Sequence, residues 1–457
     1  MVIGRRSFLF STAAFAAAPY LRTFADQSVP RCRIGVLSDI HVREPGWTLD
    51  PFVNALRWFD SMKVDGVVVA GDLADFGLVE QLAHVGAAWD AVFRGDRAAD
   101  GRRVEKLFVT GNHDRHFHNH PWVKQRIPDE KERFARSMAR DFNAAWVKCF
   151  HEEYRPVFRK DIGGFPFLAR QYGEKGLADL IGREKHSLDP SRPFFVVQHQ
   201  HPKGTCYGPD AWGHDDGKDS TAVLSAFPNA VAFSGHSHYS LTDERTVWQG
   251  SFTSVGTGSL CSIAAHYGYE NGENPGLKRT EEMPMFVGGG KHGLLLNVYD
   301  DRLVLERRDF YPKSCPRLGP DWTIPLPFAE PAPFAFARRG RIFPVPEFPK
   351  GAKVSVRHAD GPNRKKVIHP QAVIEFPAAT SGSGRVFDYE VEVMSGAKKS
   401  LVRRVLSPTF SHLPEKDGGT VSCVFAASEL PEGARIKVTP RNSYAGRGHD
   451  ITTEHPD

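Results

Sequence analysis

Carboxylate, amide and imidazole side chains recur along this sequence directly after short apolar runs. They stand in S-D-I-H, G-D, G-N-H-D, Q-H-Q-H and G-H-S-H, in that order along the chain. Each apolar run is typical of a buried β-strand, and ligands of α/β proteins bind beyond the carboxyl ends of such strands. The residues concerned are Asp39, His41, Asp72, Asn112, His113, Asp114, His199, His201, His236 and His238.

These side chains suit a site for two metal ions. Asp, Asn and imidazole are ligands of borderline divalent cations such as Mn, Zn and Fe. One carboxylate can bridge two cations ~3.5–4 Å apart, and such a pair can clamp the oxygens of an in-line phosphoryl displacement. Glycine precedes Asp72, Asn112 and His236, so the backbone can turn sharply and approach the cations. The pattern predicts two divalent metal ions without fixing which metal binds.

The segments between these motifs predict the elements that must position them. From Arg33 to about residue 240, strand-like runs alternate with amphipathic, helix-like segments. Such alternation is typical of an α/β fold with a largely parallel sheet covered on both faces. A tight turn at Asp300 and Asp301, between two alternating runs, predicts a closing hairpin.

The composition changes after Phe310. Nine of the 33 prolines lie between Pro316 and Pro349, so residues 312–350 are expected to form a stiff Pro-rich linker. Residues 351–457 contain short alternating strands separated by Gly, Ser and Pro, which predicts a small all-β sandwich. This C-terminal part holds no set of residues typical of catalysis, and we assign it a binding or packing role.

Residues 1–25 have the layout of an export signal. Arg5 and Arg6 precede an apolar run over residues 8–18, and residues 23–25 offer a cleavage site. The run R-R-S-F-L resembles a twin-arginine signal, which implies export of the folded protein to the periplasm or the extracellular space. An uncleaved N-terminal anchor is the alternative. No other segment approaches the length of a transmembrane helix.

Charge and cysteine content narrow the partners. The formal charge of +5 falls to about +2 without residues 1–25, which hold three arginines and no acidic residue. The sequence therefore predicts no basic groove, and nucleic acid is not an expected partner. The six cysteines lack C-x-x-C spacing, which argues against a zinc knuckle and leaves any disulfide pairing open.

Taken together, D-x-H, G-D, G-N-H-D, a strand-end histidine and G-H-x-H resemble the calcineurin-like metallophosphoesterase superfamily over residues 33–311. The resemblance implies an α/β fold in which a two-sheet sandwich is flanked by helices, followed here by the small all-β domain. It also implies two metal sites that share Asp72: a first with Asp39, His41 and His238, and a second with Asn112, His199 and His236.

The same resemblance implies roles for residues that do not bind metal. A metal-bridging hydroxide would attack phosphorus, and His113 would assist the leaving group, oriented by Asp75. Asp75 can equally be an ordinary acid at a helix start. His199 is preferred over His201 as ligand because it directly follows the strand, so His201 would face substrate. His116 is a candidate phosphate contact, although its His-rich segment can also be a polar loop.

The expected activity is hydrolysis of phosphoric esters, in a small molecule or an exposed substrate, with monoester and diester both open. Two alternatives are a non-catalytic binding or adhesion protein that uses the C-terminal sandwich, and a nuclease of the same superfamily. Loss of a metal ligand would favour the first and a basic groove the second. The sequence shows neither feature.

Overall fold

The computed structural model describes residues 29–43, 49–208, 215–265, 286–362, 367–382, 384–396, 401–410 and 419–455. The expected export signal, residues 1–25, lies outside them. No helix within the described ranges is long and apolar enough to cross a membrane. All six cysteines lie in these ranges, and all six are free thiols.

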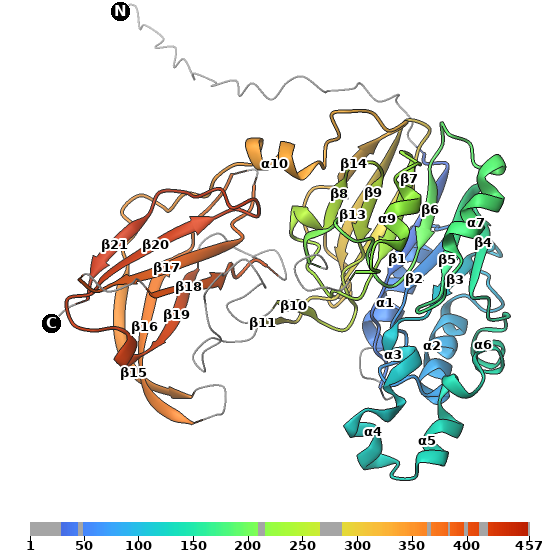
Figure 1. Ribbon diagram of the computed structural model, residues 1–457, viewed down its shortest axis with the longest axis horizontal. Coiled ribbons are helices and arrows are strands. Elements are labelled where there is room, and N and C mark those ends of the chain that lie inside the picture. Colours follow the sequence, from blue (N-terminus) through green and yellow to red (C-terminus); the bar gives the residue numbers. More distant parts are fainter. Residues whose placement is uncertain are drawn as a thin grey trace, which may run out of the picture.

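Two mixed sheets build the larger lobe (Figure 1). The first has the order β14-β13-β12-β1-β2-β3, with bounds Trp322–Pro325, Arg302–Asp309, His292–Val298, Cys32–Leu37, Gly66–Ala70 and Glu105–Val109. The second has the order β4-β5-β6-β7-β9-β8, with bounds Val157–Ile162, Phe165–Arg170, Phe194–Val197, Ala230–Ser234, Thr253–Gly256 and Val247–Gln249.

The first sheet is antiparallel from β14 to β1 and parallel from β1 to β3, whereas the second sheet has a parallel centre and an antiparallel strand at each edge. β1, β2 and β3 are parallel to one another, as are β5, β6, β7 and β9. The expected hairpin is present as β12 and β13. The largely parallel sheet expected from the sequence is therefore two mixed sheets, whose parallel strands bring their carboxyl ends to a common edge.

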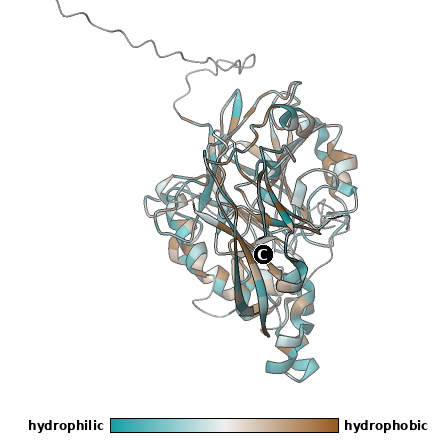
Figure 2. Ribbon diagram, turned by 90° about the vertical axis from the view of Figure 1, so that its left-hand side faces the viewer, coloured by the Kyte–Doolittle hydropathy of each residue, from teal (hydrophilic) through white to brown (hydrophobic). Residues whose placement is uncertain are grey.

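Apolar side chains fill the space between the two sheets, among them Val36 of β1, Phe167 of β5 and Phe233 of β7. Figure 2 shows hydrophobic segments on the strands and on the helices. Helices α1 (Leu49–Ser61), α2 (Val79–Val92) and α6 (Phe142–Phe150) pack on the first sheet. Helices α7 (Leu177–Glu184) and α9 (Asp219–Leu224) pack on the second. Because both faces are covered, the central strands read as continuous apolar runs.

Short helices and a small hairpin lie between the longer elements of the larger lobe. Helices α3 (Asn112–His116), α4 (Pro121–Arg126) and α5 (Glu130–Arg136) follow β3, and the hairpin of β10 (Ile263–Ala265) and β11 (Phe286–Gly288) follows β9. Part of the expected linker belongs to the first sheet, because β14 pairs with β13 and buries Trp322 and Ile324. Helix α10 (Phe336–Ile342) then leads to the smaller lobe.

The smaller lobe is an antiparallel sandwich. Its sheets are β15-β16-β19 (Ser355–Pro362, Ile368–Pro377 and Thr420–Ala426) and β18-β17-β20-β21 (Leu401–Leu406, Asp388–Met394, Arg435–Arg441 and Ile451–Glu454). The alternating apolar residues of β17 face the core, as its pattern predicts. Asp388, on the polar side of that pattern, is fully buried and paired with Arg441 at 2.6 Å.

Glycine at position 35 lets α1 lie close to β1, since a methyl group there would stand 2.4 Å from Cε2 of Phe59. We expect Gly35→Ala to lower the free energy of unfolding by about 1–3 kcal/mol, as overpacking does. Urea unfolding checks this. Gly182→Ala in α7, where a methyl group meets no atom within 4 Å, is the control. A loss no larger than that of the control would contradict this account of the packing.

Candidate metal centre

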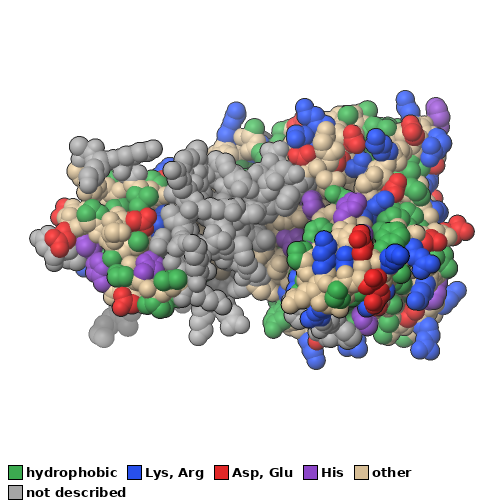
Figure 3. Space-filling model, turned by 60° about the horizontal axis from the view of Figure 1, so that its bottom comes forward, with side chains coloured by type: hydrophobic (Ala, Val, Ile, Leu, Met, Phe, Trp, Pro, Cys, Tyr) green, Lys and Arg blue, Asp and Glu red, His purple; other side chains and the backbone are tan. Residues whose placement is uncertain are grey.

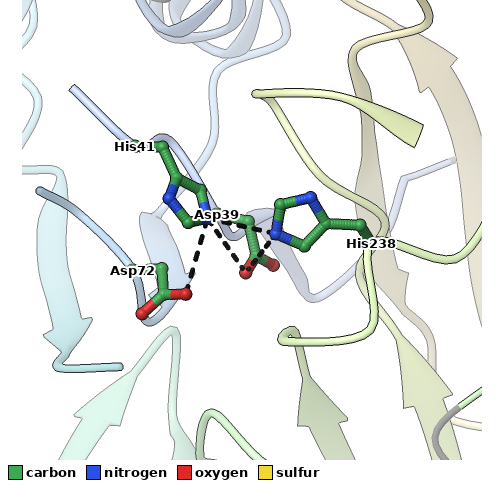
Figure 4. A group of neighbouring side chains, drawn as sticks. All are labelled: Asp39, His41, Asp72 and His238. Carbon is green, nitrogen blue, oxygen red and sulfur yellow. Dashed lines mark hydrogen bonds and ion pairs between the residues drawn. The ribbon is translucent and has the colours of Figure 1, made fainter. Parts of the chain in front are cut away.

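The predicted ligands meet at the edge of the sheets where the parallel strands end. Asp39 and His41 follow β1, and Asp72 follows β2. Asn112 begins α3 after β3, His199 follows β6, and both His236 and His238 follow β7. Figure 4 shows the side chains of Asp39, His41, Asp72 and His238 pointing toward one another.

The ligand atoms form two groups that share Asp72. Asp39, His41, Asp72 and His238 offer atoms within 4.8 Å of one another, as do Asp72, His199 and His236. Oδ2 of Asp72 lies 3.4 Å from His41 Nε2 and 3.2 Å from His199 Nε2. His199 Nε2 also lies 3.0 Å from Asn112 Oδ1. This donor set, with one carboxylate between two groups of imidazoles, fits two borderline divalent cations.

Three of the imidazole rings are fixed through Nδ1. His41 Nδ1 lies 2.9 Å from Asp75 Oδ1, and His199 Nδ1 lies 2.8 Å from the Ala70 carbonyl. His238 Nδ1 lies 3.1 Å from the Ser262 carbonyl. These oxygens accept the Nδ1 proton, which leaves Nε2 of each ring as the nitrogen that faces the centre. Such outer partners commonly set the tautomer and orientation of metal-binding histidines.

Charge is concentrated in this buried cluster. Burial alone would raise the pKa of Asp39, but His238 and His41 hold it well below its usual range. Burial alone would lower the pKa of His199, but the Asp72 carboxylate raises it to about 9. Burial would also lower the pKa of His41, but its contacts with Asp39 and Asp75 raise it well above the usual value. A cation binding here must therefore displace protons from the rings.

The backbone is left-handed at most of the ligand positions. Left-handed φ values of 50° to 69° occur at Asp39, His41, Asp72, His236 and His238. Such a conformation costs a non-glycine residue of order 1 kcal/mol or more, and it persists where the surrounding structure enforces it. These left-handed residues come two to four positions after the strands end at Leu37, Ala70 and Ser234.

The glycines beside the ligands make room for neighbouring ligand side chains. A Cβ at Gly111 would lie 2.0 Å from Asp72 Oδ1, and one at Gly235 would lie 2.5 Å from Asp39 Oδ2. The sequence predicts that these glycines let the backbone approach the cations, and this stays a prediction. In the structure each glycine also lets a carboxylate from a neighbouring strand end lie against the chain.

His113 and Asp75 lie together beside the first group. His113 Nδ1 donates to the Asp75 carbonyl at 2.8 Å and lies 3.4 Å from its carboxylate. The His113 ring stacks on Phe117, with centroids 3.7 Å apart, and meets His41 edge-on at 4.4 Å. The Asp75 carboxylate is closer to His41 than to His113, and it also pairs with Arg43. Asp75 thus contacts both rings.

The two predicted substrate contacts differ in position. His116 is exposed, and its ring lies 5.8 Å from Tyr172, which in turn lies 5.9 Å from the ring of His199. It therefore stands at the rim of the second group. His201 is 1% exposed, and its Nε2 lies 3.4 Å from Ser237 Oγ. The substrate contacts of both residues stay predictions, and burial gives that of His201 no support.

Asp114 is a buried residue to which the sequence assigned no role. Its carboxylate accepts hydrogen bonds from the backbone of Leu73, Ala74 and Gly111. Burial and the neighbouring Asp72 raise the pKa of Asp114 to about 6, although these hydrogen bonds oppose the shift. Asp114 thereby fastens the end of β3 to the end of β2. Its position at the end of the G-N-H-D motif is the sequence feature that could have indicated this role.

Comparison with known families agrees with this geometry. The family model described as calcineurin-like phosphoesterase matches residues 32–240. Residues 32–240 belong to the calcineurin-like phosphoesterase family, and the larger lobe that holds them is the phosphoesterase domain. This family match and the Asp/His cluster support a dimetal phosphoesterase.

Solved structures resemble the chain only distantly. A dimetal phosphatase from Danio rerio shows 13% identity and a TM-score of 0.35, covering 66% of this chain and 100% of its own. GAP50, the anchor in the inner membrane complex of Plasmodium, shows 12% identity and a TM-score of 0.38, covering 65% and 90%. At these values neither match bears on activity. No curated protein matches the sequence significantly.

The phosphoesterase domain offers a test of the shared carboxylate. Gly111 has φ −110°, which alanine adopts without strain, so Gly111→Ala adds only the collision with Asp72. We expect this variant to bind Mn²⁺ or Zn²⁺ about 10- to 100-fold more weakly. Titration against a competing chelator measures this. Unchanged binding, in protein that unfolds like the Gly182→Ala control, would contradict the role given to Asp72.

Proposed function

We propose that the chain is a phosphoric-ester hydrolase that uses two divalent cations. The observation that carries the proposal is Oδ2 of Asp72, which lies within 3.4 Å of an imidazole nitrogen from each ligand group. In this proposal Asp39, His41 and His238 hold one cation, and Asn112, His199 and His236 hold the other. Bound there, two divalent cations would supply activation of a water molecule and neutralisation of phosphoryl oxygens.

The residues around this centre orient the substrate and manage its protons. Because His113 Nδ1 donates to the Asp75 carbonyl, Nε2 is the nitrogen that can hand a proton to the leaving oxygen. The Asp75 carboxylate, 3.4 Å from the same nitrogen, also faces the ring and helps to orient it. Figure 3, in which the bottom of the Figure 1 view comes forward, shows histidine side chains on the surface of the larger lobe. In this proposal exposed His116 contacts a phosphate of the substrate at the rim of the centre.

Hydrolysis of paired chromogenic esters tests the proposal. Metal-stripped protein is reloaded with Mn²⁺, Zn²⁺ or Fe²⁺ and offered p-nitrophenyl phosphate and bis(p-nitrophenyl) phosphate. We expect metal-dependent turnover, and the preferred ester decides between monoesterase and diesterase. Absence of turnover with every metal, in protein shown to hold two cations, would contradict the hydrolase and favour a binding role.

The role of His113 predicts a dependence on the leaving group. Without a proton donor, departure of an alkoxide or phenoxide suffers more than departure of p-nitrophenoxide. We expect His113→Asn to lower kcat for phenyl esters by about 10²-fold or more, and for p-nitrophenyl esters by far less. His151→Asn is the control, since this exposed residue caps α6 in a left-handed conformation that asparagine accepts. Equal losses for both leaving groups would contradict proton donation by His113.

A further inference from the structure

The chain that follows His238 lies between the two lobes. Residues 239–246, here called the His238 loop, include the buried side chains of Tyr239, Ser240, Thr242 and Arg245. On the side of the phosphoesterase domain, the Leu241 amide donates to His292 Nδ1 at 3.2 Å, and the Leu241 carbonyl accepts from Arg307. The opposite side of the loop meets the C-terminal sandwich.

Phe410 of the sandwich contacts this loop through its backbone and its ring. Its carbonyl accepts hydrogen bonds from Ser240 Oγ and from Thr242 Oγ1, the latter at 2.6 Å. Its ring lies 5.5 Å from Tyr239, the residue directly after His238, and 5.9 Å from Phe387. Phe387 and Phe410 belong to the sandwich, so two of its aromatic side chains pack against the His238 loop.

The same aromatic cluster also packs beside Ser262, whose carbonyl orients the His238 ring. Ile263 packs with Tyr239, Phe387 and Phe410, and it directly follows Ser262. The carbonyl of Ser262 lies 3.1 Å from His238 Nδ1. The sandwich therefore packs against Tyr239, which follows the ligand His238. It also packs against Ile263, which follows Ser262, the residue whose carbonyl orients the His238 ring.

A buried ion pair strengthens the contact between the lobes. Arg245 pairs with Asp243 at 2.8 Å, and Tyr239 Oη donates to Asp243 at 2.7 Å. The Arg245 guanidinium lies 3.5 Å from the centroid of Tyr207 and 4.4 Å from that of Phe387. Cation–π contacts of this kind are strongest where water is excluded, as it is here.

From these contacts we propose that the C-terminal sandwich is a structural part of the metal centre, with Phe387 and Phe410 as positioning residues for His238. His238 has φ 51°, a conformation that persists only where surrounding contacts impose it. The sandwich holds the residues that follow His238 from one side, and strands β12 and β13 of the phosphoesterase domain hold them from the other. The proposal rests on the proposed function, because it assigns the support of one of its two cation sites.

Metal titration of the full chain tests it. We expect Phe410→Ala to bind one of two Mn²⁺ equivalents about tenfold more weakly, as loss of an outer support does, and to leave the other unchanged. Phe425→Ala is the matched control, because Phe425 is fully buried in the sandwich core away from this cluster. It should lower the unfolding temperature without changing either affinity. Thr242→Val, which loses the hydroxyl that donates to Phe410, should lower the affinity for the same Mn²⁺ equivalent. Thr242→Ser, which keeps a hydroxyl, should bind that equivalent as the wild type does.

Each outcome separates this proposal from the proposed function. Two wild-type affinities in Phe410→Ala would overturn it, as would equal weakening by Phe410→Ala and Phe425→Ala, which would reduce the effect to general stability. A wild-type chain that binds no Mn²⁺ would instead overturn the two-cation function. Thermal unfolding of each variant identifies those that fail to fold, and the Thr242 pair then carries the test.

Discussion

The orientation of the Asp72 carboxylate is the constraint on which the site depends. Its Oδ1 accepts a hydrogen bond from the His113 amide at 2.9 Å, so Oδ2 is directed between His41 and His199. A buried carboxylate needs opposite charge nearby, since burial without a partner costs several kcal/mol. Imidazoles from both groups supply that charge here, and two cations would supply it in their place.

The fold makes this arrangement possible by bringing separate strand ends to one edge. β1, β2 and β3 of one sheet deliver Asp39, His41, Asp72 and Asn112, while β6 and β7 of the facing sheet deliver His199, His236 and His238. The apolar core between the sheets fixes the distance between these two sets. Asp114 and the small glycines then allow the loops to pack closely enough for carboxylates to lie against backbone.

Much of this could be predicted from the sequence, because short-range patterns carry it. Apolar runs marked the strands, and the residues after them marked the edge at which Asp39, Asp72 and His199 meet. Long-range contacts carry no such pattern. Trp322 lay in a Pro-rich segment yet belongs to an edge strand, and Asp388 alternated with apolar residues yet pairs in the interior with Arg441. Nothing in the sequence near Phe410 indicated that its carbonyl would meet the His238 loop.

Anomalous diffraction from crystals of the Mn²⁺-loaded protein tests whether two cations share Asp72. We expect two manganese peaks ~3.5–4 Å apart on either side of Asp72 Oδ2. One peak would be bounded by Asp39, His41 and His238, and the other by Asn112, His199 and His236. A single peak at full loading, or two peaks that do not share Asp72, would contradict this expectation.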